Sequence, residues 1–472
     1  LLNLWKESTG NLLKAYNFSD EEIEDLLEKR LELDRRIAAV VLSNEESSEY
    51  AKLYHPYSYE DFKKFAPALP LDDFFQAVIG QTPDKVIVDE ERFWQAAEQF
   101  YSEEAWPLLK ASLILSVVNL STSYLTDEIR ILSGAYGRAL SGVPEAQDKR
   151  KAAYHLAQGP FKQALGLWYA HEKFSPEAKA DVEKKVATMI DVYKERLAKN
   201  DWLTSETREK AIVKLNVIKP YIGYPEELPA RYKDKVVDES ASLFENALAF
   251  ARVEIKHSWS KWNQPVDYKE WGMPAHMVNA YYNPQKNLIV FPAAILQAPF
   301  YDLHQSSSAN YGGIGAVIAH EISHAFDTNG ASFDENGSLK DWWTESDYAA
   351  FKEKTQKVID QFDGQESYGA RINGKLTVSE NVADLGGIAA ALEAAKREPD
   401  FSAEEFFHNF ARIWRMKGRP ELMKLMASVD VHAPAKLRVN VQVPNFDDFF
   451  TTYDVKEGDG MWRSPEDRVI IW

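Results

Sequence analysis

The sequence of 472 residues contains no cysteine. Disulfides, thiolate nucleophiles and cysteine-bound metals are therefore excluded, so any metal must be held by histidine and carboxylate side chains. Long apolar runs are missing too. The longest, around residues 108–120, already contains Lys110 and Asn119, whereas a membrane helix needs about 20 predominantly apolar residues. We therefore expect no membrane span in this chain.

Basic residues are in the minority, because 73 acidic residues face 55 lysines and arginines and give a formal charge of −18. A nucleic-acid backbone would on average be repelled, so nucleic acid is not an expected partner. Hydrophobic residues make up 45% of the chain, which is enough for a large core. The length favours two large lobes.

The first 200 residues have the pattern of long amphipathic helices. Ser175 and Pro176 form the N-cap and first position of one such helix, and Ser19 and Glu22 form a capping box before another. Neither carries a catalytic constellation. Repeats with a period of 20 to 50 residues are absent, which disfavours a solenoid or a propeller.

The amino-acid composition changes after residue 225, where aromatic residues, Gly, Asn and Pro become more frequent. Residues 278–282 and 287–291 are rich in β-formers and flank Asn283 and Pro284, which predicts strand, turn and strand. We therefore expect a mainly α protein with a small β-sheet. A helical lobe would span residues 1–200 and a mixed lobe residues 201–472, with a boundary near residue 200.

The strongest motif is HExxH, formed by His320, Glu321 and His324 after an apolar run. Two histidines four residues apart project from one face of a helix and can bind a single Zn²⁺. Glu321 is placed to take a proton from a water at the metal rather than to bind the metal. With 10 histidines and 73 acidic residues in 472, chance gives such a motif in about three of a hundred chains.

A catalytic zinc needs a third protein ligand and one open position. The extended pattern with glycine at 327 and histidine at 330 is excluded, because those positions hold Asp327 and Gly330. A glutamate nineteen or twenty residues after the second histidine is excluded as well. Trp343 and Thr344 stand there, and Glu345 is one step out of register.

Glu380 and Asp384 are better candidates. They are four residues apart, so on a helix one carboxylate could bind the metal while the other orients a ligating histidine. Gly386 and Gly387 would let that helix approach a neighbour closely, or end there. The alternative is an exposed acidic helix start at Ser379, and spacing alone does not decide between the two.

Weaker candidates lie nearby and near the C-terminus. Asp327 could orient His324 or cap the end of its helix. His432 and Arg438 bring an imidazole and a guanidinium into one short segment, and a zinc hydrolase needs such donors for its oxyanion and substrate. We expect the other histidines to be structural: His55, His155, His171, His257, His276, His304 and His408.

Taken together, these motifs resemble the neprilysin and endothelin-converting-enzyme family of zinc metallopeptidases, most closely its bacterial endopeptidase O branch. The resemblance is carried, in the family's order, by residues 278–282, 289–297, 320–324 and 380–384 and by Trp472, and residues 202–214 and 222–225 extend it upstream. It is specific over residues 200–472 and general over the helical part.

The resemblance implies a two-lobed gluzincin, with a thermolysin-like catalytic lobe and a large helical lobe that covers the cleft. It implies one Zn²⁺ per chain, bound by His320, His324 and Glu380. Glu321, His432 and Asp384 would be catalytic, and Asp384 and Asp327 would orient the ligands. The implied substrate-binding residues are Asn279 and Ala280 for the main chain, Arg438 for a carbonyl, and an apolar pocket of Ile295, Phe300, Val317, Ile413 and Trp414.

The expected function is therefore a zinc endopeptidase that cuts oligopeptides on the amino side of hydrophobic residues. The alternatives are a peptide-binding or surface-adhesion protein of the same fold without turnover, and an exopeptidase of related chemistry. The lack of cysteine fits a bacterial member, for which we expect a cytoplasmic location with export or surface display left open. The family's N-terminal stretch before the helical lobe is not part of this sequence, and the oligomeric state is not indicated.

Overall fold

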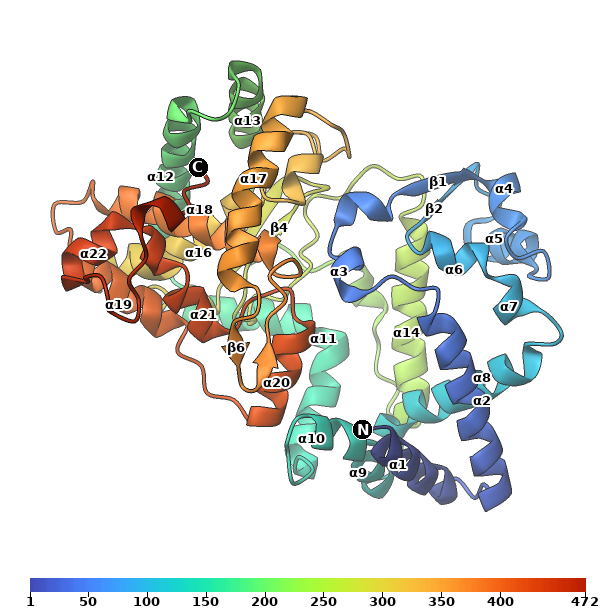
Figure 1. The fold of residues 1–472 in the computed structure, drawn as a ribbon. Coiled ribbons are helices and arrows are strands. Elements are labelled where there is room, and N and C mark those ends of the chain that lie inside the picture. Colours follow the sequence, from blue (N-terminus) through green and yellow to red (C-terminus); the bar gives the residue numbers. More distant parts are fainter. The chain divides into compact units, whose positions relative to one another are not determined.

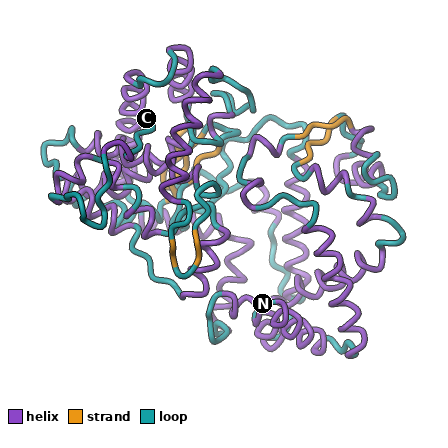
Figure 2. The backbone as a smooth tube through the Cα atoms, viewed as in Figure 1, coloured by secondary structure: helices purple, strands orange, loops and turns teal.

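The computed structural model describes residues 1–472, which divide into two compact units. Unit 1 comprises Leu1–Phe161 and Pro229–Asp267, and unit 2 comprises Lys162–Leu228 and Tyr268–Trp472. Helices dominate and the strands are few and short (Figures 1 and 2). The mainly α fold with a small sheet is therefore confirmed.

The sequence predicted a boundary near residue 200. The first division between the two units lies instead within helix α11 (Lys149–Lys173). Pro160 interrupts this helix, because proline lacks the N–H that the helix needs and clashes with the preceding turn. Phe161 is non-helical, with φ −111° and ψ 17°. Residues 229–267 return to unit 1, where Phe250 packs edge-on against Phe161. A single boundary in the sequence could not describe this crossing.

Unit 1 is built from helices and one hairpin. Its α-helices are α1 (Leu2–Ala15), α2 (Asp20–Ala38), α3 (Asn44–Ser47), α4 (Tyr59–Lys63), α5 (Leu71–Ile79), α6 (Glu91–Gln95), α7 (Glu98–Tyr101), α8 (Trp106–Ser121), α9 (Asp127–Ser133), α10 (Ala135–Leu140), the first part of α11, and α14 (Leu243–Ser260). Its 3₁₀ turns are η1 (Tyr50–Leu53), η2 (Thr122–Tyr124) and η3 (Ala230–Asp234). Strands β1 (His55–Ser58) and β2 (Lys85–Val88) pair antiparallel, with His55 opposite Val88.

Helices α1, α2 and α8 of unit 1 share an apolar core that includes Leu13, Leu27 and Leu115. The predicted capping box is present at the start of α2: the Ser19 hydroxyl accepts the Glu22 N–H, and the Glu22 carboxylate accepts the Ser19 N–H at 2.8 Å. The two free N–H groups of this helix end are thereby satisfied locally.

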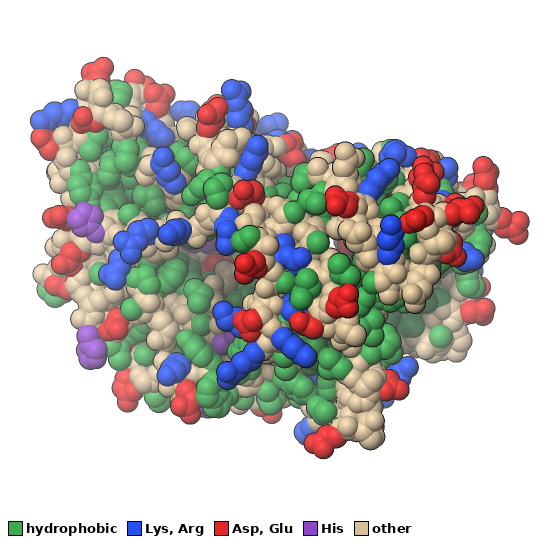
Figure 3. Space-filling model, turned by 90° about the horizontal axis from the view of Figure 1, so that it is seen from below, with side chains coloured by type: hydrophobic (Ala, Val, Ile, Leu, Met, Phe, Trp, Pro, Cys, Tyr) green, Lys and Arg blue, Asp and Glu red, His purple; other side chains and the backbone are tan.

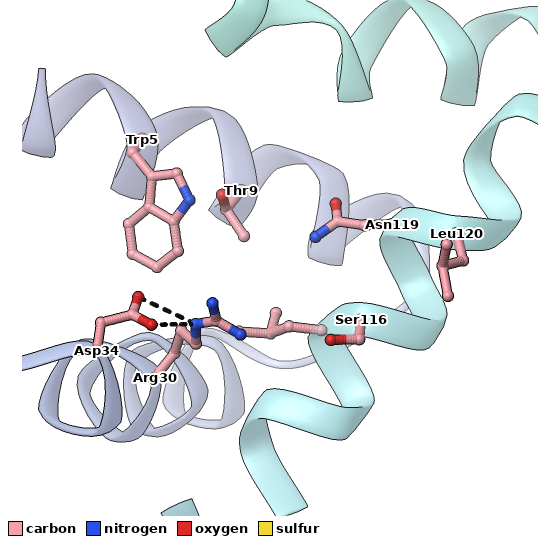
Figure 4. A pocket seen from close by; sticks show the side chains of 8 residues that line it. Trp5, Thr9, Arg30, Asp34, Ser116, Asn119 and Leu120 are labelled. Atoms are coloured by element: carbon pink, nitrogen blue, oxygen red, sulfur yellow. Dashed lines mark hydrogen bonds and ion pairs between the residues drawn. The ribbon is translucent and has the colours of Figure 1, made fainter. Parts of the chain in front are cut away.

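The same three helices line a pocket of about 380 Å³ (Figure 4). Arg30 and Asp34 form an ion pair at one side of it, with an Nε–Oδ1 distance of 3.0 Å, and Trp5 faces them. The lining contains no histidine and lies in unit 1, whereas the HExxH motif lies in unit 2. This pocket is therefore not the predicted metal site.

Unit 2 contains the second part of α11, α12 (Pro176–Lys199), α13 (Ser205–Val217), α15 (Ser307–Asn310), α16 (Ala316–Ser323), α17 (Glu345–Phe362), α18 (Val378–Ala395), α19 (Ala403–Ile413), α20 (Pro420–Val429), α21 (Ala435–Asn440) and α22 (Asp447–Tyr453). A π-helical turn, η4 (Tyr311–Gly315), precedes α16, and 3₁₀ turns occur at η5 (Gly330–Ser332), η6 (Val443–Asn445) and η7 (Pro465–Asp467). Helix α12 is the helix predicted after Ser175.

The sheet of unit 2 has the order β3-β5-β4. Strand β3 (Lys219–Gly223) runs parallel to β5 (Leu288–Pro292), and β4 (Tyr281–Asn283) is antiparallel to β5 and forms an outer edge. A small hairpin joins β6 (Glu366–Ser367) and β7 (Ala370–Arg371). The strand predicted over residues 278–282 begins only at Tyr281, because Asn279 takes part in local bonds: its N–H donates to Met277 and its side chain accepts the Ala280 N–H.

Helices α16 and α18 pack against each other in the core of unit 2, with glycine at the contact. A Cβ atom on Gly387 would lie 2.9 Å from the Ala316 carbonyl oxygen and 2.9 Å from the His320 nitrogen. One on Gly386 would lie 2.3 Å from the Ser323 hydroxyl, which accepts a hydrogen bond from Trp472 Nε1 at 2.9 Å. Since α18 continues to Ala395, the two glycines permit close approach and do not end the helix.

None of the helices combines the length and the apolar composition that a membrane crossing requires. On the face drawn in Figure 3, acidic and basic side chains are interspersed among apolar ones.

Gly386→Ala should lower the free energy of unfolding by about 1–3 kcal/mol, because the added methyl group overpacks a contact between two helices. Gly460→Ala is the matched control in the same unit, since a Cβ there meets nothing within 4 Å, and it should change stability by less than about 0.5 kcal/mol. Urea unfolding of both variants measures the difference. Equal stabilities would show that α16 and α18 tolerate a wider spacing.

Candidate metal centre

The HExxH motif lies on α16, as predicted, with His324 at its C-cap in helical conformation. The Nε2 atoms of His320 and His324 are 3.0 Å apart. Glu380, near the start of α18, brings its Oε2 to 3.2 Å from the first of these nitrogens and 3.6 Å from the second. These residues form a group whose ligand atoms all lie within 4.8 Å of one another.

The other nitrogen of each imidazole faces a carboxylate. His320 Nδ1 lies 2.8 Å from Asp384 Oδ1, and His324 Nδ1 lies 2.6 Å from Asp327 Oδ2. An ionised carboxylate only accepts hydrogen bonds, so each Nδ1 is assigned as the protonated nitrogen. Both Nε2 atoms are then left with lone pairs and lie close to each other and to the Glu380 oxygen.

The donor set fits a zinc ion. Oε2 of Glu380 is buried and accepts no hydrogen bond from the protein. Three lone-pair donors in a buried space repel one another unless a cation lies among them. Two imidazole nitrogens and one carboxylate oxygen, with room for one more ligand, form the set that catalytic zinc sites use.

The sequence alternative of an exposed acidic helix start at Ser379 is wrong. Helix α18 begins at Val378 with Thr377 as its N-cap residue, and the Glu380 side chain is 14% exposed. Burial alone would raise the pKa of Glu380, but positive charge on His324 and His320 in their protonated forms holds this pKa well below its usual range. Glu380 is therefore ionised at neutral pH.

Asp384 is held by Arg438 as well as by His320. The guanidinium donates through Nε at 2.8 Å and through Nη2 at 2.6 Å, a two-point contact of the strong kind. Burial would raise the pKa of Asp384, but Arg438 and His320 together lower it to about 2. Arg438 in turn lies over the ring of Trp414, 3.8 Å from its centroid.

Asp327 is 1% exposed, so it is not a solvated cap. Its Oδ2 accepts hydrogen bonds from His324 Nδ1 and from the Ser379 hydroxyl, each at 2.6 Å. Its Oδ1 accepts the N–H groups of Asn329 and Gly330 at 2.8 and 2.6 Å. The sequence analysis missed Ser379 as a link between α18 and Asp327. Its position directly before Glu380 was the only available signal.

Glu321 and His432 approach the cluster from different elements. Glu321 is buried on α16, and burial raises its pKa more than His320 and His324 lower it. His432 has a 46% exposed side chain whose Nε2 lies 3.2 Å from Glu380 Oε2. Its Nδ1 and backbone N–H both contact Asp430 Oδ1, at 2.8 and 2.9 Å. The structure therefore brings this weak sequence candidate to the group of His320, His324 and Glu380.

The predicted substrate residues all lie in unit 2. Asn279 is exposed and Ala280 is buried, and both directly precede β4, whose outer edge pairs with no other strand. Five apolar residues join the main hydrophobic cluster of this unit: Ile295 and Val317 as buried members, and Phe300, Ile413 and Trp414 as partly buried ones. No other histidine belongs to the metal-binding group.

Comparisons with known proteins agree with this geometry. Two models of Peptidase family M13 match residues 1–225 and 279–469. A protein of Streptococcus gordonii named as a zinc metalloproteinase in the scaA 5′ region is 75% identical over 406 residues, covering 86% of this chain and 72% of that protein. Neutral endopeptidase of Lactococcus lactis is 48% identical over 472 residues, covering 100% of this chain and 75% of the relative.

Comparison with solved structures also supports a zinc peptidase fold. The crystal structure of PepO from Lactobacillus rhamnosis HN001 matches with a TM-score of 0.96 at 37% identity, over 100% of this chain and 75% of that one. Sequence, fold and donor geometry thus agree with the resemblance seen in the motifs, and the chain belongs to peptidase family M13, the neprilysin-like zinc metalloendopeptidases.

Proposed function

We propose that this chain hydrolyses oligopeptides at internal bonds, on the amino side of hydrophobic residues, with one Zn²⁺ held by His320, His324 and Glu380. The observation that carries the proposal is the convergence of two imidazole nitrogens and a buried carboxylate oxygen that accepts no hydrogen bond. Family membership supports peptidase chemistry. The substrate preference and the roles of individual residues are inferred from the geometry.

When bound, zinc supplies Lewis-acid chemistry, polarising a carbonyl and acidifying water. Glu321 acts as the general base: its carboxylate takes a proton from the attacking water and passes it to the nitrogen of the leaving amine. Its buried position and raised pKa suit this exchange, because a carboxyl group whose pKa lies nearer to neutrality both accepts and returns a proton readily.

The remaining polar groups hold the substrate. With Nδ1–H bound to Asp430, His432 can donate from Nε2 only as an imidazolium, and in that form it stabilises the oxyanion that develops on the carbonyl. The substrate main chain adds to the sheet beside β4, where Asn279 and Ala280 offer polar groups of their side chain and backbone. Arg438 directs its guanidinium toward a substrate carbonyl while two of its nitrogens remain bound to Asp384.

The proposed preference for a hydrophobic residue on the amine side of the cut is supported by five apolar residues that belong to the main hydrophobic cluster: Ile295, Phe300, Val317, Ile413 and Trp414. An apolar side chain gains free energy when it leaves water for such surroundings. Glycine at the same substrate position should therefore be cut less readily.

Replacement of the carboxylate ligand tests the metal site. Glu380→Gln keeps the shape but removes the charge, and the zinc affinity should fall by more than the about 10- to 100-fold that loss of an outer partner costs. Glu345→Gln is the control, because Glu345 is exposed at the start of α17. Elemental analysis of the two purified variants measures their zinc content per chain. Full zinc content in Glu380→Gln would refute the ligand assignment.

Glu321→Ala should retain zinc and lose about 10²- to 10⁴-fold in kcat, because it removes the proton carrier and leaves the ligands in place. His324→Ala should instead lose the metal. Zinc content and the hydrolysis rate of an internally quenched peptide are measured on the same samples. Near wild-type turnover by zinc-loaded Glu321→Ala would assign the base to another group.

Cleavage of a peptide blocked at both ends tests the whole function. An endopeptidase should release internal fragments, should stop when a chelator removes the metal, and should recover when zinc is restored. Mass spectrometry of the fragments shows which bond is cut. Binding without turnover would favour the peptide-binding alternative, and no cutting until one end is unblocked would favour an exopeptidase.

A further inference from the structure

Lys214 on α13 lies in surroundings that are rare for lysine. It is 1% exposed, and its Nζ donates to three backbone carbonyls, those of Ala325 at 2.8 Å, Gly330 at 2.8 Å and Phe333 at 2.6 Å. An ammonium group has three N–H donors, so this set of carbonyls uses all of them. Burial lowers the pKa of Lys214 to about 7, although Asp327 and other acidic neighbours oppose the shift.

All three carbonyls belong to residues 325–333, which directly follow the ligand His324. The same segment contains Asp327, which binds His324 Nδ1 and the N–H groups of Asn329 and Gly330. The fit is tight: a Cβ on Gly330 would lie 1.7 Å from the His324 carbonyl oxygen. The segment is therefore folded around the Lys214 ammonium and against the backbone of a metal ligand.

The backbone of Lys214 makes a second connection. Its carbonyl accepts Asn287 Nδ2 at 3.1 Å, and the same amide group donates to Glu335 at 3.2 Å. Asn287 Oδ1 accepts the hydroxyl of Tyr282, a residue of β4, at 3.1 Å. One residue of α13 thus joins the segment behind His324 to the hairpin that follows Asn279.

We propose that Lys214 is a positioning residue of the zinc centre, which fixes residues 325–333 so that Asp327 holds His324 in its ligating orientation. The inference rests on the proposed zinc site. Lys214 itself touches neither ligand nor substrate. Without its ammonium, three buried carbonyls lose their donor, the segment rearranges to find others, and the Asp327 carboxylate no longer stays at a fixed distance from the imidazole.

The direct test is the zinc dissociation constant of metal-free protein, measured by competition with a chelator of known affinity. Lys214→Met, of similar length but without donors, should weaken zinc binding by at most about 10- to 100-fold, the loss expected when the direct partner of a ligand, here Asp327, is removed. Lys235→Met is the matched control in unit 1. Lys235 is also buried and donates to a backbone carbonyl, that of Pro160, at 2.6 Å, and it pairs with Glu254 as well, so its loss should reduce stability and leave zinc binding unchanged.

Amide exchange supplies a local readout that does not depend on catalysis. In folded Lys214→Met without metal, the N–H groups of Asn329 and Gly330 should exchange faster than in wild type, because their acceptor Asp327 is no longer fixed. In Lys235→Met they should exchange as in wild type. Excess zinc should restore much of the peptidase activity of Lys214→Met, since its catalytic groups are intact.

The outcomes separate this inference from the proposed function. If wild type binds no zinc, the proposed function itself fails. If wild type binds zinc and Lys214→Met binds it equally well, or if both lysine variants weaken it alike, the positioning role of Lys214 is refuted. Should Lys214→Met not fold, Lys214→Gln, which keeps two N–H donors, takes its place. If neither variant folds, Lys214 serves stability alone and the proposal is overturned.

Discussion

Three lone-pair donors held within one buried space impose the constraint on which unit 2 depends. The Nε2 atoms of His320 and His324 are 3.0 Å apart, and the Oε2 of Glu380 lies within 4.8 Å of both. Their orientation is set from behind, because Asp384 and Asp327 each take the proton-bearing nitrogen of one ring. A divalent cation among them converts this repulsion into the attraction on which metal binding depends.

Keeping these donors close requires two helices to touch almost backbone to backbone. Gly386 and Gly387 make this possible for α16 and α18, because any side chain there would meet Ser323 or the backbone of His320. Trp472, the last residue of the sequence, adds to this contact because its Nε1 donates a hydrogen bond to the Ser323 hydroxyl. The glycines and the tryptophan contribute no ligand, yet they determine the distance between the histidines and Glu380.

The polar groups of the site form chains that extend well beyond the metal. One runs from His320 through Asp384 and Arg438 to the ring of Trp414, and thereby joins a ligand to the apolar group proposed for the substrate side chain. Another runs from His324 through Asp327 and its segment to Lys214 and on to the β4–β5 hairpin. In the proposed function, metal binding and substrate alignment would therefore depend on the same supporting residues, so a change at one site should alter the other.

Local patterns in the sequence were sufficient for the capping box at Ser19, the helix after Ser175 and the HExxH pair, because helical spacing alone places His320 and His324 on one face. Other features depend on contacts between distant segments: the burial of Glu380, the approach of His432, the division at Pro160 and the carbonyl cage of Lys214, which in sequence resembles any lysine of an amphipathic helix. The sequence by itself determined which side chains can bind zinc and move a proton. Only the tertiary structure decided which of them meet, because distances between helices are set by packing that no single segment encodes.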